Sequence, residues 1–344
     1  MHTTTISKSR IRHLAKHVAL LTTLLMAAGC SADATSGPAS NAQAPKAPPS
    51  SAASRAATAS TVDDLGAMRL TLPGDPDWLA ADEHGIWVQR ARGELTLVDP
   101  ATTTVAHVVA LGTTDHCQGL GASYGAVWTC LSSDVIRVDP TTLEVVARLK
   151  VKKQALQGHL VGAFDRVWVL TSDGSNLVGI DPATNKVATE FELPARCSDV
   201  TIGDQVLWLP CNVDDRVLKL DPFTGEVLLN VAVDNPTQVA VDTEVWVGTA
   251  TTTLRLDPMS GDVLLSADAG TSPNGGIALA DGSVWVRNGH AFLTEIDRRT
   301  GARTQQVTAE VTSGGDMLVL DGEIWTTAFD DQQLFRLDPS PGST

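Results

Sequence analysis

Large apolar residues recur along this chain in short alternating runs, and a tryptophan marks the same place in seven of these runs. The seven tryptophans lie 38 to 41 residues apart: Trp87, Trp128, Trp168, Trp208, Trp246, Trp285 and Trp325. An aspartate follows each of them by 11 to 13 residues, and six of the seven aspartates directly precede a proline. The chain therefore contains seven copies of one unit of about forty residues.

Each unit predicts four short strands separated by turn residues. Residues 276–309 show the pattern, since alternating runs at 276–280, 283–288, 292–297 and 302–309 are divided by Asp-Gly, a polar loop and Arg-Arg-Thr-Gly. Four strands at this period are typical of a β-propeller blade. The repeat tryptophans sit between β-branched neighbours, so we expect them to fill the dry space between adjacent blades.

The two ends of the repeat region predict how the ring closes. The last unit stops at residues 334–339 without a fourth strand, whereas Met68–Leu72 is a spare strand before the first unit. Pairing these two segments would close the ring without an exposed edge. We therefore predict an all-β fold, a seven-bladed β-propeller of four-stranded blades over residues 64–339, with a short tail at 340–344.

The N-terminus predicts export and lipidation. Basic residues precede an apolar run over residues 18–28, and small residues then lead into Cys30. This build is typical of a signal peptide over residues 1–29, and the end of the run resembles a lipobox, in which the cysteine becomes the lipidated N-terminus. An ordinary signal peptide and a membrane-anchor helix are the alternatives. Residues 30–63 are rich in Ala, Ser, Pro and Thr and predict a disordered tether.

The net charge of the chain limits the kinds of partner that it can bind. The formal net charge is -15, and removal of the basic signal segment makes the mature chain more negative still. Such a surface repels nucleic acid, so no nucleic-acid partner is expected. We expect the protein to lie outside the cytoplasm, held on a bacterial membrane by the lipid anchor. We also expect it to be a monomer.

Four of the five cysteines predict two disulfides. Cys117 and Cys130 are symmetric about one predicted hairpin turn, and Cys197 and Cys211 about another. Cross-strand positions in a hairpin suit disulfide geometry, and an exported protein meets an oxidising compartment. A zinc site of four thiolates is disfavoured because the two pairs lie in blades that are not adjacent.

Candidate ligand-binding residues gather where the innermost strands begin. Aligning the units on their tryptophans shows that this position is not repeated, which suggests tailoring of the channel mouth to a ligand. The candidates at the mouth and in nearby loops are Asp77, Trp78, His116, Gln118, His159, Arg196, Asp199, Gln238, Asn274, Arg287, His290 and Asp316. Polar residues around a wet channel without any function are the alternative. No cofactor is assigned, although these residues would suit a divalent cation such as Ca²⁺ or Mg²⁺.

The repeats resemble two known families. Residues 167–193, VWVLTSDGSNLVGIDPATNKVATEFEL, resemble the repeat of the YVTN (YncE-like) bacterial propellers, which implies an exported or cell-surface propeller. The repeats are also similar to those of streptogramin (virginiamycin B) lyases, seven-bladed magnesium enzymes that open a cyclic lactone. That family has Phe-Thr-Glu after its tryptophans. Here the pairs that follow are Val-Gln, Thr-Cys, Val-Leu, Leu-Pro, Val-Gly, Val-Arg and Thr-Thr, so no catalytic residue is carried over.

Three functions are weighed on this basis. The favoured one is a binding or scaffolding propeller of the cell envelope, with an envelope protein, a small molecule or a glycan as its ligand. The alternative is a metal-dependent lyase, lactonase or hydrolase that uses His159, Asp199 and Asp316 at the channel mouth. A sugar-binding role with Trp78 as the stacking platform is the third, and it depends on one aromatic residue.

Overall fold

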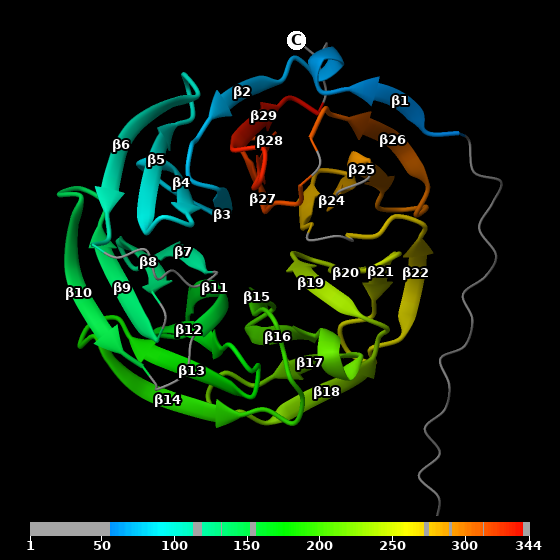
Figure 1. Ribbon diagram of the computed structural model, residues 1–344. Helices are drawn as coiled ribbons and strands as arrows, with labels where there is room; N and C mark the ends of the chain where they lie inside the picture. The colour runs from blue at the N-terminus through cyan, green and yellow to red at the C-terminus, as the bar shows by residue number, and fades with distance from the viewer. Residues whose placement is uncertain are drawn as a thin grey trace, which may run out of the picture. The chain divides into compact units, whose positions relative to one another are not determined.

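The computed structural model describes residues 56–112, 119–131, 133–151, 156–271, 275–288, 291–311 and 313–339. These residues form seven sheets around a central axis, which confirms the predicted seven-bladed propeller (Figure 1). The predicted signal peptide, Cys30, most of the predicted tether and the tail at 340–344 lie outside the described ranges. No helix in the described ranges combines the length and the apolar character needed to span a bilayer.

Each blade contributes four antiparallel strands, numbered outward from the axis. Blade 1 contains β3 (Pro76–Asp82), β4 (Gly85–Arg90), β5 (Glu94–Asp99) and β6 (Thr104–Ala110). Blade 2 contains β7 (Leu120–Ser123), β8 (Ala126–Leu131), β9 (Asp134–Asp139) and β10 (Glu144–Lys150). Blade 3 contains β11 (Leu156–Ala163), β12 (Arg166–Thr171), β13 (Asn176–Asp181) and β14 (Lys186–Glu192).

The remaining blades repeat this plan, with one short 3₁₀ helix added in blade 4. Blade 4 contains β15 (Thr201–Gly203), β16 (Val206–Cys211), η2 (Asn212–Asp214), β17 (Arg216–Leu220) and β18 (Val227–Ala232). Blade 5 contains β19 (Pro236–Val241), β20 (Val245–Thr249), β21 (Thr253–Leu256) and β22 (Val263–Ala267). Blade 6 contains β23 (Ile277–Ala280), β24 (Ser283–Asn288), β25 (Phe292–Asp297) and β26 (Arg303–Thr308), and blade 7 contains β27 (Met317–Leu320), β28 (Glu323–Ala328) and β29 (Gln333–Leu337).

Burial differs between strands because neighbouring blades cover only the middle of each sheet. All six residues of β4 are buried, since both faces of this strand pack against other blades. In β18, exposed and half-buried residues alternate, because one face of an outer strand meets water. The second strand of blade 1 is therefore covered on both faces, whereas the outermost strand of blade 4 shows the alternation of a strand with one face in water.

The N-terminal strand closes the ring as predicted. β2 (Met68–Thr71) pairs antiparallel with β29, with Met68 opposite Arg336 and Thr71 opposite Gln333. It supplies the fourth strand that blade 7 lacks, and Figure 1 shows it beside the C-terminal strands. The first and last parts of the repeat region are therefore held in one sheet.

The folded body begins at residue 58, earlier than the predicted start at residue 64, so the last residues of the predicted tether belong to the propeller. β1 (Thr58–Thr61) pairs in parallel with β26 and gives blade 6 a fifth strand, and η1 (Asp63–Leu65) follows it (Figure 1). The Thr-Ala-Ser-Thr sequence has no large apolar side chain to suggest a strand. It is ordered by backbone pairing with an open sheet edge and by burial of the next apolar residues, since Val62 is 1% exposed and Leu65 is 3% exposed.

The repeat tryptophans fill the space between blades, as predicted, and each is at most 1% exposed. In four blades a cation from the third strand lies over the face of the tryptophan: Arg137 over Trp128, Lys219 over Trp208, Arg255 over Trp246 and Arg336 over Trp325. Each cation also donates to a carbonyl in the next blade, at Pro182, Pro258, Arg298 and Ala101 respectively. We call these four contacts the inter-blade latches.

The repeated aspartates are turn residues, as the Asp-Pro pattern predicts. Asp221 Oδ1 accepts hydrogen bonds from the backbone N–H groups of Phe223 and Thr224, at 2.8 and 2.9 Å. Gly225 takes the left-handed conformation, with φ of 74°, that closes the turn. Because the N–H groups of Thr224 and Phe223 stabilise the carboxylate, the pKa of Asp221 is lowered. These aspartates therefore serve the fold and leave binding to other residues.

Candidate functional site

The mouth of the central channel holds a cavity of about 580 Å³, which we call the mouth cavity. The innermost strands and the loops leading into them bring together five of the predicted residues there: Asp77, Trp78, Asp199, Gln238 and Asp316. A second cavity of about 430 Å³ continues along the channel, and Asp199, Gln238 and Asp316 line both cavities. These three side chains therefore form the floor of the mouth cavity.

His159 lies in this floor between two carboxylates. Its Nδ1 is 2.8 Å from Asp199 Oδ2, and its Nε2 is 3.5 Å from Asp316 Oδ2. Three blades meet at this point, because His159 belongs to blade 3 whereas the aspartates precede the first strands of blades 4 and 7. Asp199 and Asp316 are 6% and 7% exposed, while a quarter of the His159 side chain remains exposed.

Backbone N–H groups fix the two carboxylates in place. Asp199 Oδ1 accepts from the N–H groups of His159 and Val200, both at 2.8 Å. Asp316 Oδ2 accepts from Leu79 at 2.9 Å, and its Oδ1 accepts from Met317 at 2.8 Å. Each aspartate thus bonds to a residue of a neighbouring blade as well as its own, so the floor also ties blades together around the channel.

The surroundings of the floor raise the pKa values of two side chains, His159 and Asp77. Burial alone would lower the pKa of His159, but the charges of Asp199 and Asp316 and hydrogen bonds to both outweigh it and hold the pKa well above its ordinary value. Burial and the nearby charge of Asp316 raise the pKa of Asp77 to about 7, against a smaller opposing effect of His159. His159 is therefore a cation at neutral pH, and Asp77 sits near its titration midpoint.

This protonation limits the chemistry that the floor supports. A histidine that holds protons on both nitrogens has no lone pair with which to act as a general base. Among the described residues, the three ligating side chains close enough to share one ion are Asp82, Glu83 and His84, in the β3–β4 turn. That group contains no predicted mouth residue, and the suitability of the mouth residues for a divalent cation such as Ca²⁺ or Mg²⁺ stays a prediction.

A serine in blade 2, Ser123, matches the Gly-x-Ser-x-Gly pattern of hydrolase nucleophiles. The pattern spans Gly121 to Gly125. Here, however, Ser123 ends β7 and is followed by a tight turn in which Tyr124 and Gly125 both have positive φ. The hydrolase motif needs a turn from a strand into a helix. The local fold therefore does not make Ser123 a nucleophile.

The other predicted residues are placed differently. Arg196 is exposed at the mouth rim and pairs with Asp214 at 3.1 Å. Arg287 is fully buried, and its guanidinium donates to backbone carbonyls of Asn288 and Ser313, so it is not available to a ligand in this structure. Its burial lowers its pKa to about 10. His116, Gln118, Asn274 and His290 lie outside the described residues.

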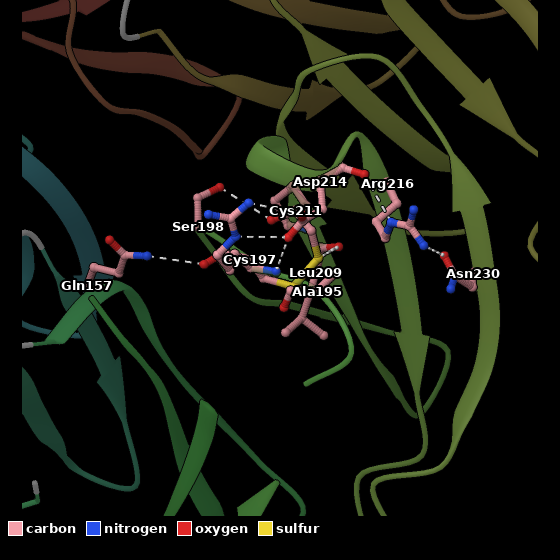
Figure 2. The surroundings of a disulfide bond; sticks show 11 residues. Gln157, Ala195, Cys197, Ser198, Leu209, Cys211, Asp214, Arg216 and Asn230 are labelled. Carbon is pink, nitrogen blue, oxygen red and sulfur yellow. Dashed lines mark hydrogen bonds and ion pairs between the residues drawn. A yellow bond between two sulfur atoms is a disulfide. The ribbon is translucent and has the colours of Figure 1, made fainter. Parts of the chain in front are cut away.

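One predicted disulfide is confirmed, and it lies beside the mouth. Cys197 and Cys211 are bonded to each other at the start of blade 4 (Figure 2). Gln157, which lines the mouth cavity, donates to the carbonyl of Cys197 at 3.1 Å. Cys130 is also disulfide-bonded, and its predicted partner, Cys117, lies outside the described residues. The Cys197–Cys211 bond therefore supports one wall of the cavity.

Some residues of the mouth cavity were not predicted. Asn212 and Phe329 line it from the loops after β16 and β28. Both stand four residues after a repeat tryptophan, Trp208 and Trp325. Their constant distance from the tryptophans could therefore have identified these two residues in the sequence. Most of the predicted residues lie instead where the innermost strands begin. Gln157, two residues before His159, was missed for another reason, because it points to the cavity from a bulged part of β11.

Solved structures with the same fold include two lyases. A streptogramin B lyase shares 15% sequence identity, covers 79% of this chain and 96% of its own, and has a TM-score of 0.65. Virginiamycin B lyase from Staphylococcus aureus shares 17% identity, with coverages of 80% and 99% and a TM-score of 0.68. The computationally designed Ika8 protein shares 14% identity, with coverages of 78% and 98% and a TM-score of 0.61. These similarities show a common propeller of the virginiamycin B lyase type; the YVTN resemblance stays a prediction.

Family membership rests on sequence. No curated protein sequence matches the chain. Residues 132–344, well over half of the chain, match the family described as outer membrane protein assembly factor BamB. The protein is thus a member of the BamB family of β-propellers.

Proposed function

We propose that the protein is a binding or scaffolding propeller of the bacterial cell envelope and that the mouth cavity is its recognition site. The observation that carries this proposal is the pairing of an open cavity of about 580 Å³ with a floor whose histidine and aspartates already satisfy one another. Ligand-binding cavities typically contain a small number of polar groups in fixed positions, which orient the ligand. A floor whose histidine and aspartates are already paired with one another favours binding over turnover.

Location supports the same reading. The family is named for an assembly factor of the outer membrane, and the Cys197–Cys211 disulfide fits an oxidising compartment. We propose that Cys30 carries the lipid that holds the body at the membrane. Metabolic labelling with an alkyne fatty acid tests this, because the wild type should be labelled and sediment with membranes. The Cys30→Ala variant should lose the label; a variant that keeps it would rule out lipidation at this residue.

The lyase alternative has weaker support. The solved lyases share the fold at 15% and 17% identity, which is too low to carry an activity over. The residues proposed for such an enzyme are His159, Asp199 and Asp316. In this structure the imidazole is held between the two carboxylates, which also accept backbone N–H groups, and this arrangement favours a structural role over removal of a substrate proton.

A screen with a blocked cavity tests the binding site. The purified full-length protein would be screened by saturation-transfer NMR against amino acids, short peptides, sugars and peptidoglycan fragments. We expect ligands of the wild type to be lost in Asn212→Trp, which places a large ring in the cavity. Ala183→Trp is the matched control, because the equivalent turn position in the next blade already carries an exposed Phe223. Ligands that bind both variants equally would place the site elsewhere.

A further inference from the structure

The mouth cavity carries an excess of negative charge. Four carboxylates line it, those of Asp77, Asp199, Asp316 and Asp330, and its described lining contains no lysine or arginine. His159 lies beneath and offsets part of the charge of Asp199 and Asp316. Asp77 and Asp330 form no ion pair with any basic side chain in the described ranges. The cavity therefore presents carboxylates without a matching cation of its own.

The walls of the cavity are aromatic as well as acidic. Trp78 of blade 1 and Phe329 of blade 7 both line the cavity. Trp78 also meets the His159 ring edge-on, with the two ring centroids 4.5 Å apart. A cation over an aromatic face gains attraction from the ring's negative centre. The chain itself uses this pairing in the four inter-blade latches, where the cation comes from the same chain. At Trp78 the described residues place no lysine or arginine over the ring, and the cation beside it is His159, which meets the ring edge-on and is already paired with Asp199 and Asp316.

We propose that the mouth cavity binds an ammonium or guanidinium group, held by Asp77 and Asp330 and packed against Trp78. This inference rests on the proposed binding function and names the chemistry of its ligand. The volume of the cavity suits a lysine or arginine side chain, or a small organic amine, better than a bare metal ion. A basic side chain of an envelope protein and a free polyamine share this chemistry, and the experiment separates them.

The ionisation of Asp77 gives the proposal a pH signature. Asp316 faces Asp77 as a like charge and His159 as an opposite one, and Asp330 lines the same cavity. With its pKa at about 7, Asp77 is half protonated in the empty protein at neutral pH. A bound cation favours the charged carboxylate. Affinity should therefore increase as the pH rises through about 7, with release of a proton on binding below that pH.

Calorimetric titration of the full-length protein with matched probes tests the proposal. The probes are N-acetyl-arginine amide, its neutral isostere N-acetyl-citrulline amide, and spermidine. We expect a cationic probe to bind at least tenfold more tightly than citrulline, and more tightly at pH 8 than at pH 6. Binding by the arginine probe alone indicates a protein side chain as the ligand, whereas binding by spermidine alone indicates a free polyamine.

Variants test whether Asp77 and Asp330 hold the cationic probe. Asp77→Asn with Asp330→Asn should weaken the cationic probe at least tenfold, while Asp165→Asn, an exposed aspartate in a turn of blade 3, should leave it unchanged. Equal affinity for arginine and citrulline probes, or no effect of the double variant, would overturn the inference. If neutral ligands from the screen still depend on the open cavity, the proposed function stands. If the cavity binds nothing in either experiment, both proposals fail.

Discussion

The space between the blades and the mouth of the channel are built by opposite rules. Between the blades one solution is repeated, since every blade buries a tryptophan that is at most 1% exposed. At the mouth the residue nine positions before that tryptophan is different in most blades: Trp78, Gly119, His159, Asp199, Thr237, Gly276 and Asp316. All seven blades must solve the same packing problem, whereas under the proposed function only some of them would face a ligand. Repetition therefore marks the fold, and its loss marks the channel mouth, where we propose the recognition site.

The two regions also differ in how polar groups are handled. In the inter-blade latches one cation meets an aromatic face and a carbonyl, and within the described ranges only the cations Arg255 and Arg336 also pair with a carboxylate, each with one half-buried glutamate. At the mouth floor, by contrast, two buried carboxylates share one imidazolium. Removing one member of such a group leaves buried charge without compensation. We therefore expect packing changes to matter most between the blades and charge changes to matter most at the mouth.

The largest expected effect comes from deleting an inter-blade ring. Trp168 is 0% exposed, stacks on Phe191 and joins the apolar residues of blades 3 and 4. Trp168→Ala should lower the free energy of unfolding by about 3–5 kcal/mol. Trp78→Ala, in a partly exposed ring, should cost less than about 2 kcal/mol. Urea denaturation followed by circular dichroism measures both; equal losses would break the division between the two regions.

Removal of the disulfide beside the mouth has the next effect. Cys197 and Cys211 are 14 residues apart, and a crosslink over that separation contributes about 3 kcal/mol in the chain-entropy account. Cys197→Ala with Cys211→Ala should lower the urea midpoint accordingly. Since the Cys197 carbonyl holds Gln157, the change should also weaken mouth binding. Wild-type protein with a reductant is the control, and it should lose at least as much stability.

The sequence could predict what is repeated or local, and less of what is unique or distant. The tryptophan period, the ring closure by Met68–Leu72 and the Cys197–Cys211 hairpin follow from patterns within one or two units. The His159–Asp199 contact spans 40 residues and depends on how blades 3 and 4 pack together, and the His159–Asp316 contact depends on the ring bringing blade 7 across the channel. β1 was missed because its pairing requires the open edge of β26, which no local pattern in Thr58–Thr61 signals. The loops that bury Arg287 could not be placed from sequence either.

The charge of His159 gives the third effect. His159→Gln keeps a hydrogen-bonding side chain but removes the cation between Asp199 and Asp316. We expect a loss of about 2 kcal/mol at pH 6, below the value for a fully buried pair because part of the ring is exposed. The folded-state pKa lies above the unfolded one, so this stabilisation is complete below about pH 6.5 and is lost as pH rises through the folded pKa.

Melting temperatures of the wild type and His159→Gln between pH 6 and pH 10 check this dependence. The gap between the two proteins should be widest at pH 6 and should narrow toward pH 10. Ser198→Ala, at the same rim but uncharged, should show a gap that does not change with pH. A gap for His159→Gln that is constant across the range would mean that the floor is held by shape and not by charge.

Asp77 gives a smaller effect of opposite sign. Its carboxyl binds a proton up to about pH 7 in the folded state but only at acidic pH when unfolded, so wild-type stability falls as pH rises between these values. Asp77→Asn removes this fall and should be more stable than the wild type by about 1–2 kcal/mol at pH 8, with the difference disappearing near pH 4. Chemical denaturation at the two pH values measures it; a destabilised variant at pH 8 would contradict the raised pKa.

The smallest effect is expected at a single latch. Arg137 lies over Trp128 with its guanidinium carbon 5.0 Å from the ring centroid, and it donates to the Pro182 carbonyl at 2.7 Å. Arg137→Met keeps the apolar stem and should cost about 1 kcal/mol, because three of the seven blades close without a latch. Arg303→Met is the control, since its pair with Asp268 is exposed and should contribute close to nothing. If both variants lose equally little, the tryptophans alone hold the blades together, and the latches serve only to keep buried carbonyls satisfied.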